Sequence, residues 1–123
     1  MTAEYAQQIT EKLLQHFGIV GWRVEIVPAF PEHPRRLGLC SYRRRTITLA
    51  EHGLENDREA WTTIWEELAH VMTPEDTEHG DRWRAVFERI AYWTVYPTSL
   101  SDRTKAASQL PLMLDESREG QNG

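Results

Sequence analysis

Two glutamates and a histidine stand at a spacing that suits metal chemistry on a helix. The stretch "WEELAH" contains Glu66 and His70 four residues apart, with Glu67 between them. Side chains at i and i+4 lie on the same helical face, so Glu66 and His70 could hold one divalent cation together. The pattern matches the helical metal motif H-E-x-x-H except at its first position, where this chain has Glu66. Glu67 stands where that motif has its general base.

A third donor for such a cation must come from outside this helix. His79 is the candidate, because it follows His70 by nine residues and a polar turn that contains proline separates the two. Gly80 comes next and would ease a tight approach to the following helix. One glutamate with two histidines is an established ligand set for catalytic Zn²⁺, and the oxygen donor would also tolerate harder ions. We therefore expect Glu66, His70 and His79 to bind Zn²⁺ or another divalent metal.

Hydrophobic periodicity around the motif predicts an α+β fold. The expected helices span residues 3–17, from Asn56 to before Pro74 and from Asp81 to before Pro97, and the expected strands span 22–27, 36–42 and 45–50. Asn56, with Glu59 three positions later, predicts the capped start of the motif helix. The arginine-rich turn at residues 43–45 is expected to join two strands as a hairpin. We expect residues 46–49 to form an edge strand of the sheet.

Length and composition indicate one soluble domain without disulfide bonds. The 123 residues are 40% hydrophobic and 27% charged, enough to bury a core, and we assign residues 1–97 to the domain and residues 98–123 to a partly disordered C-terminal tail. Cys40 is the single cysteine, which excludes an internal disulfide framework and is typical of the cytoplasm. The sequence lacks an apolar run of the roughly 18 residues that a membrane span needs, and it lacks a signal peptide. We expect a cytoplasmic protein with no membrane partner.

The charge distribution bears on nucleic acid as a partner. A net charge of −5 argues against a protein that coats nucleic acid without sequence preference. Arginines nevertheless cluster at Arg35 and Arg36 and again at residues 43–45. We expect any binding to nucleic acid to be weak and to vanish at physiological salt, because the acidic bulk of the chain opposes it. The sequence predicts no particular oligomeric state.

The run "RRLGLCSYRRRTITLA … WTTIWEELAHVM … EHGDRWRAVF" resembles the SprT-like (Spartan-type) metalloprotease domain, a minimal zincin. The resemblance covers residues 21–91 and implies an N-terminal helix, a small three-stranded sheet, the active-site helix and a following helix. Carried over residue by residue, Glu67 matches the general base, His70 the second zinc ligand and His79 the third. Glu66 occupies the position of the first ligand. The sequence shows no cysteine-rich ribbon of the kind that some members carry, so no DNA role is carried over.

The resemblance implies a metal-dependent peptidase that hydrolyses peptide bonds in a protein or peptide substrate. The edge strand expected at residues 46–49 could align that substrate by strand addition, and Tyr42 and Arg43 are the candidates for stabilising the oxyanion. Glu66 leaves a second interpretation open, in which the chain is an inactive pseudo-metalloprotease that binds a protein or nucleic acid. A third interpretation is that the motif is accidental on an ordinary helix. The presence of both Glu67 and His79 favours the enzyme.

Overall fold

Helices and strands follow the predicted order along residues 1–95, the part of the chain that the computed structural model describes. The elements are α1 (Ala3–His16), β1 (Arg23–Val27), β2 (Gly38–Ser41), β3 (Thr46–Ala50), the 3-10 helix η1 (Glu51–Leu54), α2 (Asp57–Met72) and α3 (Asp81–Val95). The predicted α+β class is confirmed, with an N-terminal helix, a three-stranded sheet, the motif helix and a following helix. The predicted C-terminal tail, residues 98–123, lies outside the described residues.

The strand order of the sheet differs from the sequence order. The order is β1-β3-β2, with β1 parallel to β3 and β2 antiparallel to it as the predicted hairpin. β3 is therefore the central strand, and all of its residues are buried. The prediction that residues 46–49 form an edge strand is wrong, because the parallel pairing with β1 covers the second side of β3. The strand of the hairpin that lies at an edge of the sheet is β2.

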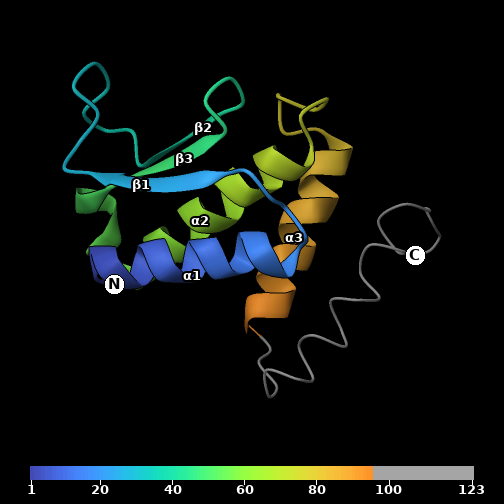
Figure 1. Cartoon of the computed structure of the whole chain (residues 1–123), viewed down its shortest axis with the longest axis horizontal. Coiled ribbons are helices and arrows are strands. Elements are labelled where there is room, and N and C mark those ends of the chain that lie inside the picture. Colours follow the sequence, from blue (N-terminus) through green and yellow to red (C-terminus); the bar gives the residue numbers. More distant parts are fainter. Residues whose placement is uncertain (96–123) are drawn as a thin grey trace.

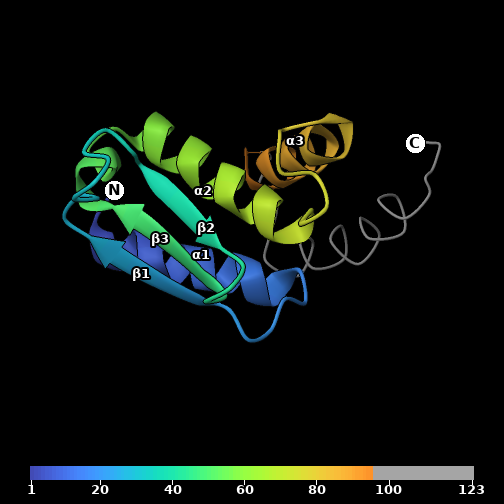
Figure 2. The ribbon, with the colours of Figure 1, turned by 90° about the horizontal axis from the view of Figure 1, so that it is seen from above.

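Two helices cover one face of the sheet, as Figure 1 shows and the view from above in Figure 2 confirms. α1 runs beneath β1, and α2 runs alongside β2. Ile47 and Leu49 of β3 and Ile64 and Leu68 of α2 are fully buried and belong to one hydrophobic core between the sheet and the helices. Full burial of such a side chain stabilises the fold by about 1.5–3 kcal/mol, so this contact fixes α2 against the sheet. α3 packs on α2 at the end away from η1.

The start of α2 is fixed by the residue that the sequence predicted. The Asn56 side chain accepts a hydrogen bond of 3.0 Å from the backbone N–H of Glu59. Such a cap satisfies one of the free N–H groups of the first turn and stabilises a helix by about 1 kcal/mol. Because the first residue of α2 is fixed, the positions of Glu66, Glu67 and His70 along the helix, and so relative to β2, are fixed as well.

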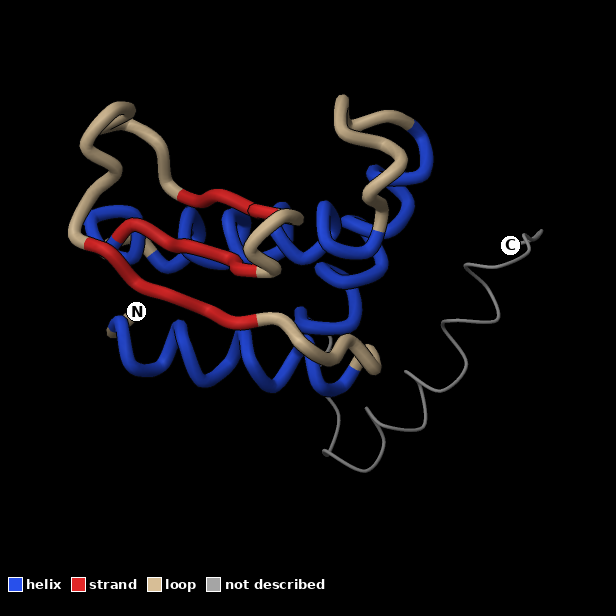
Figure 3. Tube along the Cα trace, turned by 45° about the horizontal axis from the view of Figure 1, so that its top comes forward, coloured by secondary structure: helices blue, strands red, loops and turns tan. Residues whose placement is uncertain are grey.

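Two loops rise at opposite ends of the sheet (Figure 3). One, residues 28–37, connects β1 to β2, and the other, residues 73–80, connects α2 to α3. Together they bound the surface between β2 and α2. None of the helices in the described part is long and apolar enough to span a bilayer.

Candidate metal centre

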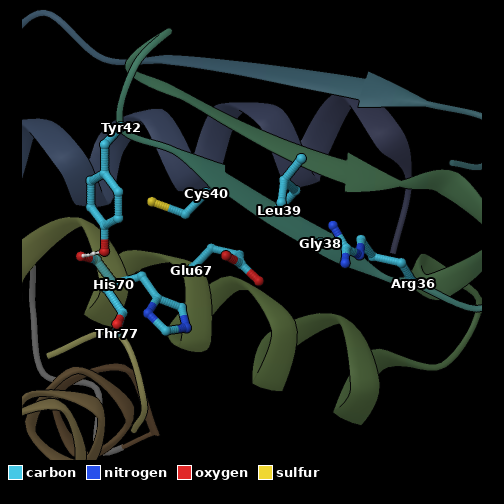
Figure 4. A pocket seen from close by; sticks show the side chains of 8 residues that line it. All are labelled: Arg36, Gly38, Leu39, Cys40, Tyr42, Glu67, His70 and Thr77. Carbon is cyan, nitrogen blue, oxygen red and sulfur yellow. Dashed lines mark hydrogen bonds between the residues drawn. The ribbon is translucent and has the colours of Figure 1, made fainter. Parts of the chain in front are cut away.

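A cleft of about 350 Å³ lies between the edge strand β2 and helix α2. Strand β2 and its flanks, helix α2 and the loop after α2 line it with Arg36, Gly38, Leu39, Cys40, Tyr42, Glu67, His70 and Thr77. Figure 4 shows the Glu67 side chain on α2 below strand β2, with the His70 side chain beside it on the same helix. The predicted general base and one predicted metal ligand therefore share one cleft, beside a strand that has no neighbour on its outer side among residues 1–95.

The loop after α2 brings the two predicted histidines together. The Nε2 atoms of His70 and His79 lie 2.8 Å apart, within hydrogen-bonding distance. His79 is exposed and has a left-handed backbone conformation, with φ of 58°. Its ring lies flat on the indole of Trp83, with ring centroids 3.9 Å apart and planes 3° apart. The sequence predicted the meeting of His70 and His79, but it gave no sign of the support from Trp83.

Glu66 lies one helical turn before His70 and is half-buried. Burial raises the pKa of the Glu66 carboxyl, while the nearby His79 acts in the opposite direction. Among residues 1–95, no three or more His, Cys, Asp or Glu side chains form a group that could hold a metal ion as they stand. The complete ligand set of Glu66, His70 and His79 therefore stays a prediction.

The donors that are present nevertheless fit a divalent metal. Burial, and then the neighbouring His79, lowers the pKa of His70, which favours the neutral imidazole that binds metals. Two imidazole nitrogens on a tetrahedral Zn²⁺ lie about 3.3 Å apart, so the pair at 2.8 Å would need to open by only about 0.5 Å. A carboxylate oxygen from Glu66 would complete the set of two histidines and one glutamate.

Glu67 is the most deeply placed acid of the cleft, with 8% of its surface exposed. Burial raises the pKa of its carboxyl to about 7, the Glu66 carboxylate adds to this, and the Arg36 guanidinium opposes it. A carboxyl that titrates near neutral pH can both take up and release a proton under physiological conditions. This property suits the role of general base that the motif assigns to Glu67.

Gly38 allows β2 to pass close to α2 beside Glu67. A Cβ atom at this position would lie 2.6 Å from Cγ2 of Thr63 and 3.1 Å from Cγ of Glu67. A contact of 2.6 Å forces neighbouring atoms to move. The missing side chain at Gly38 therefore sets the width of the cleft at the general base.

Gly38→Ala should lower the free energy of unfolding by about 1–3 kcal/mol, because an extra methyl group must be fitted into a packed contact. The second substitution Thr63→Ser removes the Cγ2 atom that the new methyl group meets. The double variant should therefore recover part of the lost stability. Urea unfolding of the wild type, the two single variants and the double variant measures both effects. Equal losses in the single and the double variant would contradict the assigned contact.

Tyr42 and Cys40 complete the wall of the cleft on the β2 side. The Tyr42 hydroxyl donates a hydrogen bond of 2.7 Å to the backbone carbonyl of His70, which ties the hairpin to the last turn of α2. Burial, and then the charge of Glu67, raises the pKa of the Cys40 thiol to about 12, so this thiol is neutral at physiological pH. Arg43, the other predicted oxyanion candidate, does not line the cleft. Arg36 and Cys40 were not predicted as cleft residues; Arg36 lies in the loop just before β2, and Cys40 lies within β2.

Comparisons with known proteins agree with this arrangement. Residues 2–106 match the SprT-like family. The chain belongs to the SprT-like family. The crystal structure of the metallopeptidase zymogen of Pyrococcus abyssi abylysin has the same fold, with a TM-score of 0.54 and 22% identity over 93% of this chain and 97% of that chain. No curated protein gives a significant match. Membership of the SprT-like family supports a function of the metallopeptidase type.

Proposed function

We propose that this SprT-like chain is a divalent-metal-dependent peptidase with Glu67 as its general base. His70, His79 and Glu66 are the proposed metal ligands, and Zn²⁺ is the proposed ion. The observation that carries the proposal is the placement of His79 against His70, with Nε2 atoms 2.8 Å apart, beside a cleft that Glu67 lines. An ordinary helix with an accidental motif gives no reason for the loop that follows it to fold back and place a histidine at this position.

The residues of the cleft divide the chemistry between them. When bound, the ion supplies Lewis-acid polarisation of a peptide carbonyl and lowers the pKa of a water molecule. Glu67 takes a proton from water and passes it to the departing amine, which its pKa of about 7 permits. His70 and His79 would hold the ion, and their rings are kept in place by helix α2 and by the stack on Trp83, respectively.

Strand β2 is the proposed guide for the substrate. It lies at the edge of the sheet and lines the cleft, so its outer backbone groups can pair with an extended peptide. β2 takes the role predicted for residues 46–49, because β3 is the central strand. We propose a protein or peptide substrate in the cytoplasm, and only weak contact of nucleic acid with Arg35, Arg36 and residues 43–45.

Cleavage of an unfolded fluorogenic protein substrate tests the proposed function. The zinc-loaded wild type should cleave it, and removal of metal with a chelator should stop cleavage until Zn²⁺ is restored. Glu67→Gln should reduce the rate by about 10²–10⁴-fold while leaving the bound metal in place, because only the proton carrier is lost. Cleavage that survives Glu67→Gln, or that a chelator does not affect, would contradict the proposal.

A further inference from the structure

The carboxylate of Asp76 bridges the loop that carries His79. One oxygen, Oδ1, accepts a hydrogen bond of 2.8 Å from the backbone N–H of Gly80. The other, Oδ2, accepts one of 3.0 Å from the backbone N–H of Trp83. Because these two donors lie after His79 and the carboxylate lies before it, the bridge closes the loop around His79. The loop is thereby joined to the first turn of α3.

The glycine after His79 fits this bridge. A Cβ atom on Gly80 would lie 2.8 Å from both oxygens of Asp76, so any other residue would displace the carboxylate. The "His-Gly" pair of the sequence thus has two separate structural roles. The histidine supplies the ring, and the glycine leaves room for the carboxylate that orients the loop.

The bridge compensates for an unfavourable backbone conformation. His79 has a φ of 58°, in the left-handed region that residues other than glycine seldom adopt. Such a conformation persists only where the surrounding contacts impose it, and it is frequent at functional sites. The contacts here are the Asp76 bridge on the backbone side and the parallel stack on Trp83 on the ring side. Together they direct Nε2 of His79 toward Nε2 of His70.

We propose that Asp76 is a positioning residue that presets His79 for metal binding through the backbone of the loop. The inference rests on the proposed function for the identity of the ligand, but the preset ring is a property of the metal-free chain. Hydrogen bonds that orient metal ligands typically contribute 10–100-fold to metal affinity. A simple cap of α3 would stabilise that helix without any effect that depends on the His79 side chain.

A double-mutant cycle with Zn²⁺ as the probe separates these two roles. Asp76→Ala should weaken Zn²⁺ binding by about 10–100-fold in the wild-type background, measured by competition with a chromogenic chelator. In a His79→Ala background the same substitution should change Zn²⁺ affinity very little, because the ligand that it positions is gone. An equal loss in both backgrounds would overturn the proposal, since Asp76 would then act by another route. The absorption spectrum of the Co²⁺-loaded protein should also change on Asp76→Ala in the wild-type background and stay unchanged in the His79→Ala background.

Glu75→Gln is the matched control for charge. Glu75 adjoins Asp76 in the same loop and makes an exposed ion pair of 2.8 Å with Arg82, so this variant also removes one negative charge there. It should leave the affinity for Zn²⁺ within about twofold of the wild type, because exposed ion pairs contribute little. A loss as large as that of Asp76→Ala would attribute the effect to charge alone and overturn the proposal.

A metal-free measurement keeps this inference distinguishable from the proposed function. The ring protons of His79 should resonate far upfield in the NMR spectrum of the metal-free wild type, because the ring lies on the face of Trp83. Asp76→Ala should remove that shift, and a shift that persists would overturn the positioning role. Should Asp76→Ala fail to fold, Asp76→Asn keeps one acceptor and should reduce the shift in part. A wild type that shows the shift but binds no Zn²⁺ would refute the metal site while supporting the preset loop.

Discussion

Protein that carries both His70→Ala and His79→Ala should contain no bound divalent metal after purification, whereas the wild type should carry about one ion per chain. The two imidazoles are the donors that the fold brings within 2.8 Å of each other, and Glu66 alone cannot compete with water for the ion. Elemental analysis by mass spectrometry of protein purified without chelator measures the difference.

Histidines elsewhere on the surface provide the control for that loss. His33 and His52 are exposed and lie outside the cleft. The variant His33→Ala with His52→Ala should therefore keep the full metal content. Unchanged metal in the His70 and His79 double variant would remove the metal centre from the proposal. Circular dichroism should show that both variants retain their helices, since none of the four side chains belongs to the core.

Glu66→His should rebuild H-E-x-x-H and make the site more selective for Zn²⁺ over Mn²⁺ than the wild type is. A neutral imidazole replaces a carboxylate, which removes a negative charge and a hard oxygen donor from the site. If Glu66 is a ligand, the wild type already binds metal, and the variant should change affinity and peptidase rate only moderately. Titrations with Zn²⁺ and Mn²⁺, followed by the peptidase assay, measure both quantities.

The same variant decides between an enzyme and a pseudo-metalloprotease. A wild type that stays metal-free in excess Zn²⁺, beside a Glu66→His protein that binds it, would show that the first ligand has been lost rather than replaced. Glu88→His on α3 introduces a histidine outside the cleft and should alter neither property. Adding Glu67→Gln should reduce any peptidase activity by about 10²–10⁴-fold in either background and leave the metal bound, because the proton carrier is not a ligand.

Local features of the chain were predictable because their causes are local. The helix around Glu67 follows from apolar residues at helical spacing, and its start follows from the Asn56 cap, which forms as expected. The hairpin of β2 and β3 is also a contact between neighbours in the sequence. The i,i+4 spacing of Glu66 and His70 places them on one face in any α-helix.

Contacts between distant segments decided the rest. The residue pattern predicted the three α-helices, the three strands, the motif on α2 and the family resemblance, but not the 3-10 helix η1. Only the tertiary structure determined that β1 pairs with β3, which makes β2 the edge beside the cleft. It also raised the pKa of Glu67 to about 7 through burial, and it joined Asp76 to the start of α3. Strand pairing and burial depend on which residues far apart in the sequence meet in space, and the closed loop depends on backbone angles such as the positive φ of His79, which residue spacing does not predict.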